Sequence, residues 1–388
     1  MTTGKKSVTV RFSSTSTVGQ YKLIELPPEL IKVVEAKDAK ALTKVSIRGR
    51  TTDDAVLCTD TRTYSLRSVQ MSNSYLVLTG SNKAEDDHGK LILRDQVNEI
   101  IELVPVVPKL DRLTALLRGN SYKLDGDNDE DEDTEDDRPR KRRRFSYAQV
   151  RGLVQASDKE LDRGLRDKHI LSVDGHLQSI PASQLTQFLT FILTILVSHH
   201  SSKTTDISLK DLTDQLQDDH AIAPDVSRQI CGWFGDIQPG DKWTMDVEPV
   251  VKEVGLGVLV EHRHRALTES QLLDKWKAAV GDTFESYVKL DLLAGNYVPT
   301  IPETISTASS TNPKQYLKYF PASELPTNPS QRFTDLFLTR KSWKLEELAP
   351  FLQDIAVDKK ERDKLLMKFT RTSTDSDGVV WYNARAKY

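Results

Sequence analysis

The side chains of this sequence whose types and spacing could carry chemistry are cationic, and they gather near the end of the chain. Lysine and arginine bind phosphate groups at about one charge each, whereas reading a base requires Asn, Gln or Arg directed into a groove. A predicted third helix in this region is lysine-dominated, which favours DNA binding without sequence specificity, and Trp381 could stack on an unpaired base. The candidate DNA-binding residues are Arg340, Lys341, Lys344, Lys359, Lys360, Arg362, Lys364, Lys368, Arg371, Trp381, Arg385 and Lys387.

The same lysines are open to a second interpretation, a solvated helix face. Between Asp358 and Lys387, five acids are interleaved with eight cations, which leaves an excess of three positive charges. An excess of this size is compatible with phosphate binding and with a purely solubilising role, so both interpretations stay open.

The sequence shows little that is typical of a metal site or of a catalytic nucleophile. His262 and His264 flank one arginine, and His199 and His200 are adjacent, whereas zinc ligands on one helix face stand three or four residues apart. We therefore predict no metal site from the histidines and no catalytic residues.

The two cysteines, Cys58 and Cys231, lie far apart in the sequence and are interpreted as small buried apolar side chains in a reducing compartment. The sequence has no Walker-type phosphate loop. Gly255 and Gly257 lack the third glycine and the preceding strand of a dinucleotide site. These observations predict no cofactor and no enzyme activity.

An acidic run followed by a basic run interrupts the sequence at 125–144. Residues 125–137 hold ten carboxylates and no base, so the rest of the chain sums to −3 + 10 = +7. We expect a disordered insertion here. The basic run has the composition of a nuclear-import signal, with a nucleic-acid tail or a merely solvated run as alternatives. Its cations are Arg138, Arg140, Lys141, Arg142, Arg143 and Arg144.

Residues 1–107 read as a strand-rich module, which Pro105 and Pro108 end because proline cannot donate to a strand ladder. A helix is expected around 28–36. Between Thr51 and Leu78, turn signals at 53–54, 60 and 72–73 predict an antiparallel meander. The expected strands are Val8–Phe12, Tyr21–Glu25, Thr43–Arg48, Ala55–Cys58, Tyr64–Val69, Tyr75–Leu78, Lys90–Arg94 and Ile100–Val107.

From residue 108 onward, three helices followed by a short hairpin recur every 60–80 residues, which is the winged-helix plan. The fold class predicted is therefore α+β multidomain, with a strand-rich N-terminal module followed by a tandem array of winged helices. The most apolar run, Leu185–Val197, is too short to span a bilayer and is predicted to be a buried helix. The expected units are 108–181, 184–245 with a degenerate wing, 246–321 and 322–388.

Several local signals set the expected helix ends. Ser157 with Glu160, and Thr268 with Gln271, match capping boxes, and Asp358 is expected to cap the last helix. Pro350 interrupts an apolar stripe, so that helix must kink or start late. Other expected helices are Tyr147–Leu153, Pro224–Phe234, Val250–Glu261, Glu269–Val280, Ser286–Ala294 and Ser330–Leu338, with hairpins over 174–175 and 377–378.

Four segments resemble the sister-chromatid cohesion proteins of the DCC family, which form an accessory subunit of the alternative, replication factor C-like clamp loader. The segments are TTDDAVLCTDTRTYSLRSVQMSNSYLVL (51–78), FSYAQVRGLVQASDKELDRGLRDKHILSVDGHLQSIP (145–181), YLKYFPASELP (316–326) and DGVVWYNARAKY (377–388). The family is described with three winged helices, whereas the pattern here shows four units, and the insertion at 125–144 has no counterpart.

The resemblance implies a nuclear, non-enzymatic subunit. Its N-terminal strands would complete an interlocked β-barrel with a small accessory subunit and the C-terminus of the large loader subunit. Its winged helices would bind single- and double-stranded DNA and DNA polymerase epsilon, with PCNA an indirect partner and no membrane. The apolar residues that would serve the barrel are Val56, Leu57, Tyr64, Leu66, Val69, Tyr75, Leu76, Val77 and Leu78.

Two other function classes compete with this one. A winged-helix array used only for protein docking would need its basic residues for solubility alone. A transcription factor is disfavoured because the lysine-rich helix lacks the Asn, Gln and multiple Arg side chains that read bases.

Overall fold

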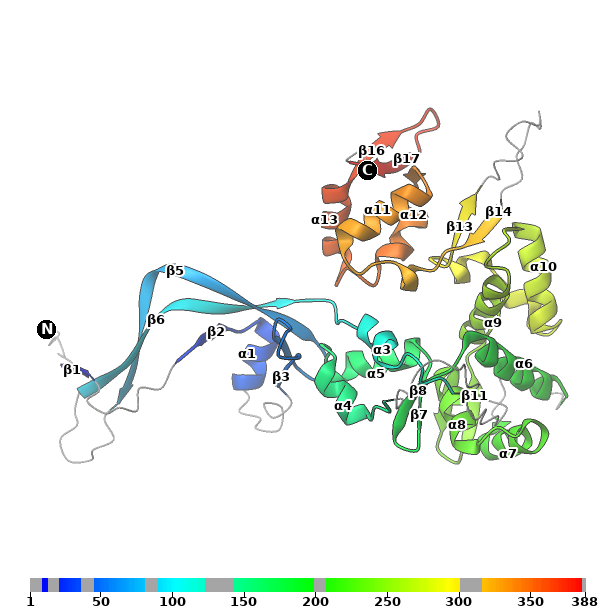
Figure 1. Ribbon diagram of the computed structural model, residues 1–388, viewed down its shortest axis with the longest axis horizontal. Helices are drawn as coiled ribbons and strands as arrows, with labels where there is room; N and C mark the ends of the chain where they lie inside the picture. Colours follow the sequence, from blue (N-terminus) through cyan, green and yellow to red (C-terminus); the bar gives the residue numbers. More distant parts are fainter. Residues whose placement is uncertain are drawn as a thin grey trace, which may run out of the picture. The chain divides into compact units, whose positions relative to one another are not determined.

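The computed structural model of the chain describes residues 9–12, 21–35, 45–80, 90–122, 143–198, 207–300 and 316–385. The chain divides into two compact units. The first unit takes residues up to Lys109 together with Arg151–Leu161, and the second takes Leu110–Val150 and Asp162–Tyr388. One sheet dominates the first unit, and helices with small sheets make up the second (Figure 1), so the α+β class is confirmed.

The first unit is built on a six-stranded sheet in the order β1-β6-β5-β4-β3, with β2 also paired to β6. Strands β1 and β2 run parallel to β6, and the other neighbours are antiparallel. Over the described residues this sheet is open and does not close into a barrel. The elements are β1 (Thr9–Phe12), β2 (Leu23–Glu25), α1 (Pro28–Glu35), β3 (Ser46–Arg48), β4 (Val56–Cys58), β5 (Thr63–Gly80) and β6 (Lys90–Pro105).

The expected turn at Ser72-Asn73 is wrong, because β5 continues through it as one strand of 18 residues. Gln70 pairs with Glu99 and Tyr75 pairs with Val97, so the four residues 71–74 oppose a single residue of β6. The polar pair thus lies in a β-bulge, which absorbs extra residues without reversing the chain. The two strands expected over 90–107 are likewise one strand, β6.

A small apolar core holds this sheet against α1. Leu30 of α1 packs with Leu57, Tyr64 and Leu103 of the sheet. The Tyr64 hydroxyl donates to the Glu29 carboxylate, and burial together with that carboxylate raises the pKa of Tyr64 to about 12. The core therefore lies at the β4 end of the sheet, under the first residues of β5.

From α3 onward the chain repeats one order of elements: helix, short strand, helix, helix, hairpin; the first repeat includes residues 151–161, which group with the first unit. In three repeats the short strand pairs with one strand of the hairpin and makes a three-stranded sheet. In the first repeat a single parallel bridge from Ser121 to Ser179 stands where that strand would be. The first two repeats contain α3 (Asp111–Leu116), α4 (Tyr147–Leu153), α5 (Asp158–Asp167), β7 (Ile170–Val173), β8 (His176–Ser179), α6 (Ala182–Ser198), β9 (Ile207–Ser208), α7 (Leu209–His220), α8 (Pro224–Trp233), β10 (Gly235–Gln238) and β11 (Lys242–Met245).

The third and fourth repeats follow the same order. The expected helix over 286–294 is wrong, since two short 3₁₀ helices stand there instead. The elements are α9 (Val247–Glu261), β12 (Leu267–Thr268), α10 (Glu269–Val280), η1 (Glu285–Tyr287), η2 (Leu290–Leu293), β13 (Tyr297–Thr300), β14 (Tyr316–Tyr319), η4 (Ala322–Glu324), α11 (Pro329–Thr339), β15 (Ser342–Trp343), α12 (Leu345–Leu348), η5 (Ala349–Leu352), α13 (Lys359–Phe369), β16 (Thr370–Thr374) and β17 (Val380–Ala384).

Several expected helix signals are confirmed by the hydrogen bonds. Ser157 and Glu160 exchange the two capping-box bonds, at 2.9 and 3.3 Å, and Thr268 forms a box with Gln271. Asp358 caps α13 through the Glu361 amide. At Pro350 the α-helical stripe gives way to the 3₁₀ turn η5, because proline cannot donate within a helix.

Gly255 and Gly257 let α9 approach its neighbours closely. A Cβ at Gly255 would lie 2.4 Å from the Trp276 ring of α10, and one at Gly257 would lie 2.3 Å from Thr186 of α6. These glycines serve helix packing in the main apolar core, which also buries most of α6. Of the helices described, none has the length and apolar character needed to cross a membrane.

Candidate functional sites

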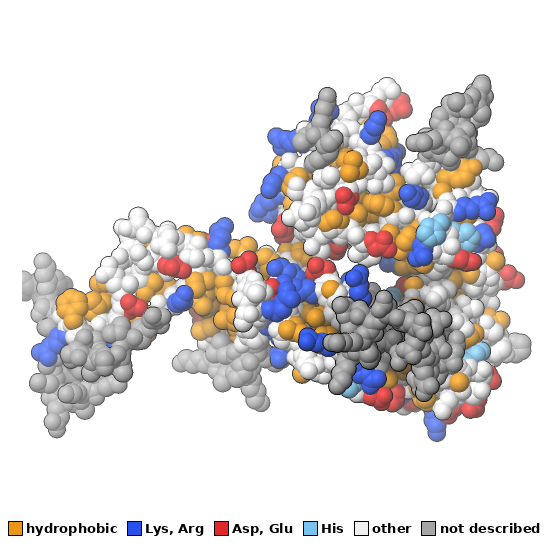
Figure 2. All heavy atoms as spheres, in the orientation of Figure 1, with side chains coloured by type: hydrophobic (Ala, Val, Ile, Leu, Met, Phe, Trp, Pro, Cys, Tyr) orange, Lys and Arg blue, Asp and Glu red, His pale blue; other side chains and the backbone are white. Residues whose placement is uncertain are grey.

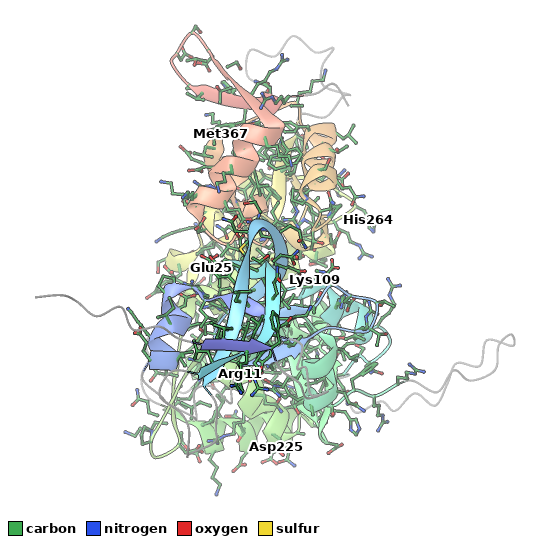
Figure 3. All side chains as sticks on the ribbon, turned by 90° about the vertical axis from the view of Figure 1, so that its left-hand side faces the viewer. Arg11, Glu25, Lys109, Asp225, His264 and Met367 are labelled. Carbon is green, nitrogen blue, oxygen red and sulfur yellow. The ribbon has the colours of Figure 1, made fainter. Side chains whose placement is uncertain are left out.

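The lysines of α13 form an exposed face in the fourth repeat. Leu366 on the opposite side is buried, and Phe369 stacks on Phe333 of α11 at 5.0 Å between ring centroids. Met367, labelled in Figure 3, is 67% exposed among the lysines. Because residues three and four apart share a helix face, the exposed side chains run along one line. These side chains are Lys360, Lys364, Met367 and Lys368, and the exposed Arg371 follows on β16.

The acids of this region are engaged locally. Glu361 accepts from the Val357 amide at 2.8 Å, and Asp363 pairs with Arg362 at 2.9 Å. The Asp358 carboxylate caps the helix and accepts from the Glu361 amide. Within the described part of the chain, the α13 lysines and Arg371 form no ion pair: Lys359, Lys360, Lys364, Lys368 and Arg371.

Trp381 of β17 lies in a cluster of cations rather than open to solvent. Its ring centroid is 5.4 Å from Lys344 Nζ and 5.9 Å from Arg340 Cζ. Its indole Nε1 donates to Asp375 at 2.8 Å, and this bond is the main cause that lowers the pKa of Asp375. The structure thus brings three predicted site residues together, but a base that stacks on Trp381 must share the ring with two cations.

The remaining predicted cations are separate from that cluster. Lys341 is exposed, and Arg385 donates to the Met367 carbonyl at 2.7 Å, where it satisfies the end of α13. Lys387 lies outside the described residues, as do Arg138, Arg140, Lys141 and Arg142 of the basic run. Arg143 and Arg144 are described and exposed.

Arg332 of α11 holds the fourth repeat together and was missed by the sequence reasoning. It is fully buried, and it donates to the carbonyls of Pro326 at 2.7 Å and Phe351 at 2.8 Å and to the Asp354 carboxylate. Its place four residues before buried Leu336, in phase with an apolar stripe, is the signal that could have identified it.

A second candidate site is the outer edge of β5. Strand β4 pairs with β5 only at residues 63–65, so along residues 66–80 that edge has no strand partner among the described residues. Tyr75 is 53% exposed and Leu76 is 54% exposed, and hydrophobic side chains are visible at the surface along β5 and β6 (Figure 2).

The predicted barrel residues fall into two groups. Three of them, Val56, Leu57 and Tyr64, are buried within the first unit itself. The others lie on β5 beyond its pairing with β4, where they are half-buried or exposed: Leu66, Val69, Tyr75, Leu76, Val77 and Leu78.

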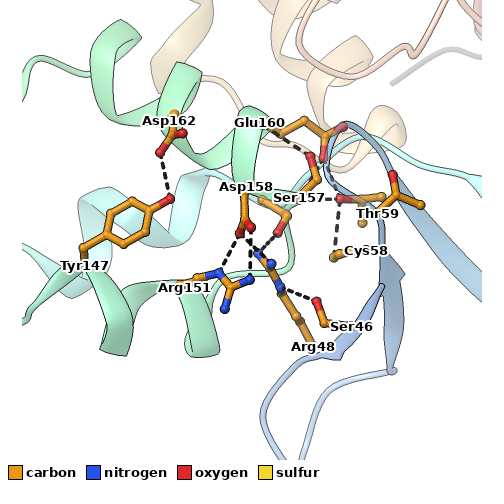
Figure 4. Close-up of polar contacts among 12 residues, drawn as sticks. Ser46, Arg48, Cys58, Thr59, Tyr147, Arg151, Ser157, Asp158, Glu160 and Asp162 are labelled. Atoms are coloured by element: carbon orange, nitrogen blue, oxygen red, sulfur yellow. Dashed lines mark hydrogen bonds and ion pairs between the residues drawn. The ribbon is translucent and has the colours of Figure 1, made fainter. Parts of the chain in front are cut away.

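The segment 151–161 is fastened to the β4 end of this sheet by a polar network (Figure 4). Arg48, nearly buried, donates to the Ala156 carbonyl and to Asp158, both at 2.6 Å. Arg151 also binds Asp158 at 2.6 Å, and the hydrogen bonds from Arg151 and Arg48 lower the pKa of Asp158 to about 2. Arg48 thus joins the segment to β3, and Arg151, within the segment, binds the same carboxylate.

A hydroxyl at the start of β5 completes this attachment. Thr63 Oγ1 donates to Glu160 at 2.6 Å and accepts from the Ser157 amide at 2.9 Å, so the capping box of α5 is also bonded to the sheet. The sequence reasoning identified the box but not its partner strand, because that contact spans more than ninety residues.

The other groups considered for chemistry have ordinary roles. His262 bonds the Val258 carbonyl at the end of α9, and His264 bonds Arg263, while His199 and His200 lie outside the described residues. Across the described ranges, no three His, Cys, Asp or Glu side chains are grouped as metal ligands.

Both cysteines are buried, as expected from the sequence. Burial raises the pKa of the Cys58 thiol and raises that of Cys231 to about 12, so both thiols are protonated near neutral pH. They therefore lack the thiolate that nucleophilic attack requires.

An open-edged sheet followed by repeated helix–hairpin units defines a mixed α+β protein with an exposed strand edge and an exposed basic helix face. The family model described as "Sister chromatid cohesion protein Dcc1" matches residues 21–352, and the chain belongs to this family. The chain is 26% identical to the sister chromatid cohesion protein DCC1 of Xenopus tropicalis, over 96% of this chain and 91% of that protein.

More distant relatives carry the same description. The human protein is 24% identical over 96% of this chain and 90% of its own length. The Saccharomyces cerevisiae protein is 19% identical over 90% of this chain and 93% of its own length. The similarity therefore extends over both units of the chain.

Proposed function

We propose that this chain is a non-catalytic, nuclear subunit of an alternative PCNA clamp loader that acts in DNA replication and sister chromatid cohesion. The observation that carries the proposal is the open edge of β5 with its exposed Tyr75, Leu76 and Leu78. An unpaired strand edge is a template on which another chain adds a strand. Membership of a sister chromatid cohesion family supports the biological setting.

On this proposal the region 1–107 is a hetero-oligomerisation module. Strands of the loader's small accessory subunit and of the C-terminus of its large subunit pair with β5 and complete a barrel with this sheet. Because alternate side chains of a strand share a face, Leu76 and Leu78 would lie together on one face of β5, which would become the inner surface of the barrel. This accounts for hydrophobic side chains that have no partner within the described sheet.

Co-expression of the full chain with these subunits tests the assembly. The double substitution Leu76→Asp with Leu78→Asp places two charges on side chains that are exposed in the free chain. We expect the variant chain to stay monodisperse and to lose its partners in size-exclusion chromatography. The control is Ile47→Asp, at a 67% exposed position of β3 away from the open edge of β5. Equal complex formation by the two variants would contradict the proposal.

The four repeats from residue 108 onward are proposed to be winged helices. Their order of helix, strand, helix, helix and hairpin supports this, and the proposed boundaries are 108–181, 184–245, 246–321 and 322–388. These repeats would bind single- and double-stranded DNA and DNA polymerase epsilon. The loader subunit would thus connect the clamp-loading machinery to the DNA and to a polymerase.

The α13 lysine line is proposed as a phosphate-binding surface. Charge reversal to Glu at Lys359, Lys360, Lys364 and Lys368 should weaken DNA binding and reduce the salt slope by about 0.9 for each phosphate that the helix no longer neutralises. The matched control reverses four exposed lysines of the second and third repeats: Lys210, Lys275, Lys277 and Lys289. Unchanged affinity and slope in the α13 variant would remove this helix from the DNA site.

The alternative is a protein-docking scaffold without direct DNA contact. The engagement of Trp381 with Lys344, Arg340 and Asp375 favours it, because the ring is already occupied by protein groups. This alternative predicts that the purified chain shows no salt-sensitive binding to single- or double-stranded DNA.

A further inference from the structure

Ser146 follows directly after the basic run, and three arginines stand at the second, third and fourth positions before it: Arg144, Arg143 and Arg142. In the whole sequence, Ser146 is the one serine or threonine that has a lysine or arginine at both the second and the third preceding position. Protein kinases that select basic substrates bind such arginines with carboxylates, in charge-assisted pairs. The sequence therefore presents the Ser146 hydroxyl to this class of kinase.

The backbone around Ser146 is held in place outside regular secondary structure. Residues 143–146 belong to no helix or strand and lead directly into α4. The Arg143 carbonyl accepts from the Asn120 side chain at 2.7 Å, and the Phe145 carbonyl accepts from the Leu177 amide at 2.8 Å. The Arg143 and Arg144 side chains are exposed. A kinase can therefore reach both arginines without opening a helix or a sheet.

The Ser146 hydroxyl is only weakly engaged. Ser146 is partly exposed, and its Oγ accepts from the Gln149 amide at 3.4 Å. Within the described ranges this oxygen takes part in no other hydrogen bond. The shorter bond of the pair, at 2.9 Å, runs from the Ser146 backbone amide to Gln149 Oε1 and does not involve the hydroxyl. Modification of Oγ thus costs the fold one long hydrogen bond.

Ser342 shows that a basic context alone does not make such a site. Arg340 and Lys341 precede it, but Ser342 lies in strand β15, and its hydroxyl donates to Asn383 Oδ1 at 2.6 Å. Arg340 is paired with Glu347 at 2.9 Å. Ser146 combines exposed arginines with a hydroxyl that is not held by a short bond.

We propose that Ser146 is a phosphorylation site for a protein kinase that selects arginine-rich substrates. In this step Ser146 Oγ bonds to the γ-phosphorus of ATP while the bond from that phosphorus to the bridging oxygen breaks. ADP leaves, and the hydroxyl proton passes to an aspartate of the kinase. The site does not depend on strand addition at β5 and goes beyond the proposed function.

The phosphate changes the charge of the basic run at 138–144. This run carries six cations, and a phosphoserine adds about −1.5 to −2 charges near neutral pH. Its charge therefore falls from +6 to about +4. Arg143 and Arg144 lie within three residues of the phosphate, so they are the cations that the phosphate neutralises first. Phosphorylation thus weakens the attraction of this run for polyanions.

Incubation of the full chain with Mg²⁺-ATP and the catalytic subunit of cAMP-dependent protein kinase, which selects arginines at these two positions, tests the proposal. We expect mass spectrometry to find a phosphoryl group on Ser146. Ser146→Asn removes the hydroxyl but keeps a residue that caps a helix well, so it should fold and lose this phosphate.

Two double substitutions test whether the kinase reads the neighbouring arginines. Arg143→Gln with Arg144→Gln should lower the kcat/KM of the kinase for Ser146 by about tenfold or more, since two charge-assisted pairs are lost. The matched control, Arg138→Gln with Arg140→Gln, removes the same charge farther from Ser146 and should keep the rate. The phosphorylated chain should also elute from heparin at lower salt than the untreated chain.

Absence of phosphate on Ser146 in the unsubstituted chain, or equal rates for the two double variants, would overturn the proposal. Phosphorylation of Ser146 only after heat unfolding would overturn it as well, because the site is inferred from the exposure of its residues in the folded chain. Unchanged elution from heparin after complete phosphorylation would contradict the effect on the basic run.

Discussion

The buried Arg332 guanidinium allows a sharp test of what stabilises the fourth repeat. Arg332→Met keeps an apolar stem of similar length but removes every donor. The carbonyls of Pro326, Phe351 and Leu325, which Arg332 binds at 2.7 to 3.1 Å, then lose their partner. At about 1 kcal/mol for each buried acceptor left unpaired, the repeat loses about 3 kcal/mol.

The ion pair with Asp354 adds little to this figure. The Asp354 side chain is 46% exposed, so water solvates its carboxylate once the arginine is gone. The loss therefore comes mainly from the backbone carbonyls, of which those of Leu325 and Phe351 are buried in the folded repeat.

Hydrogen exchange measured by mass spectrometry is the suitable assay, because a chain with several units does not unfold in one step. Peptides of α11 and α13 should exchange about 100-fold faster in Arg332→Met, as a loss of about 3 kcal/mol requires. Peptides of α6 and of the first unit should keep their rates. The control is Arg371→Met, at an exposed position of β16. A change within about twofold in Arg332→Met, as for an ordinary surface substitution, would refute this account of the repeat.

Further predictions concern the other unit and the main core. Gly255→Ala should destabilise the second unit by about 1–3 kcal/mol, because the new methyl group meets the Trp276 ring. In the control Gly152→Ala the new methyl group meets nothing within 4 Å, so the temperature of thermal unfolding should stay the same or rise. The pKa of Asp158 is lowered from 3.8 to about 2, so its contribution to stability is present above pH 3.8 and is lost as the pH falls through about 2. Asp158→Asn should remove this part of the acid dependence of the folding stability, which acid unfolding followed by circular dichroism measures. Thr63→Val should loosen the segment 151–161, because the Ser157 amide and Glu160 lose their common partner, and faster proteolysis there would reveal it.

The sequence predicted the parts of the fold that local signals determine. Helix caps at Ser157, Thr268 and Asp358, the buried helix α6 and both cysteines are as expected, because each depends on nearby residues or on strong apolar character. The 18-residue strand β5 was missed, since Ser72-Asn73 has the composition of a turn and only the pairing with β6 makes it a bulge.

The sequence indicated which residues belong to the candidate sites but not how those residues are arranged in space. The α13 lysines could be placed on one face from helical spacing alone. Arg332 could be placed on the buried face of its helix from its spacing to Leu336, but its carbonyl partners could not be predicted, because they come from loops and turns outside the helix. The link between Thr63 and the α5 cap is also long-range, and single-sequence patterns carry no information on such contacts.

The most direct test of the central claim is hydrogen exchange along β5 in the free chain and in the complex with the proposed loader subunits. Antiparallel pairing to β6 uses only part of the β5 amides, and the open edge leaves the rest to solvent. If another chain adds a strand there, every second amide between residues 66 and 80 becomes protected in the complex and exchanges rapidly without it. Unchanged exchange along this edge in an intact complex would contradict assembly through β5.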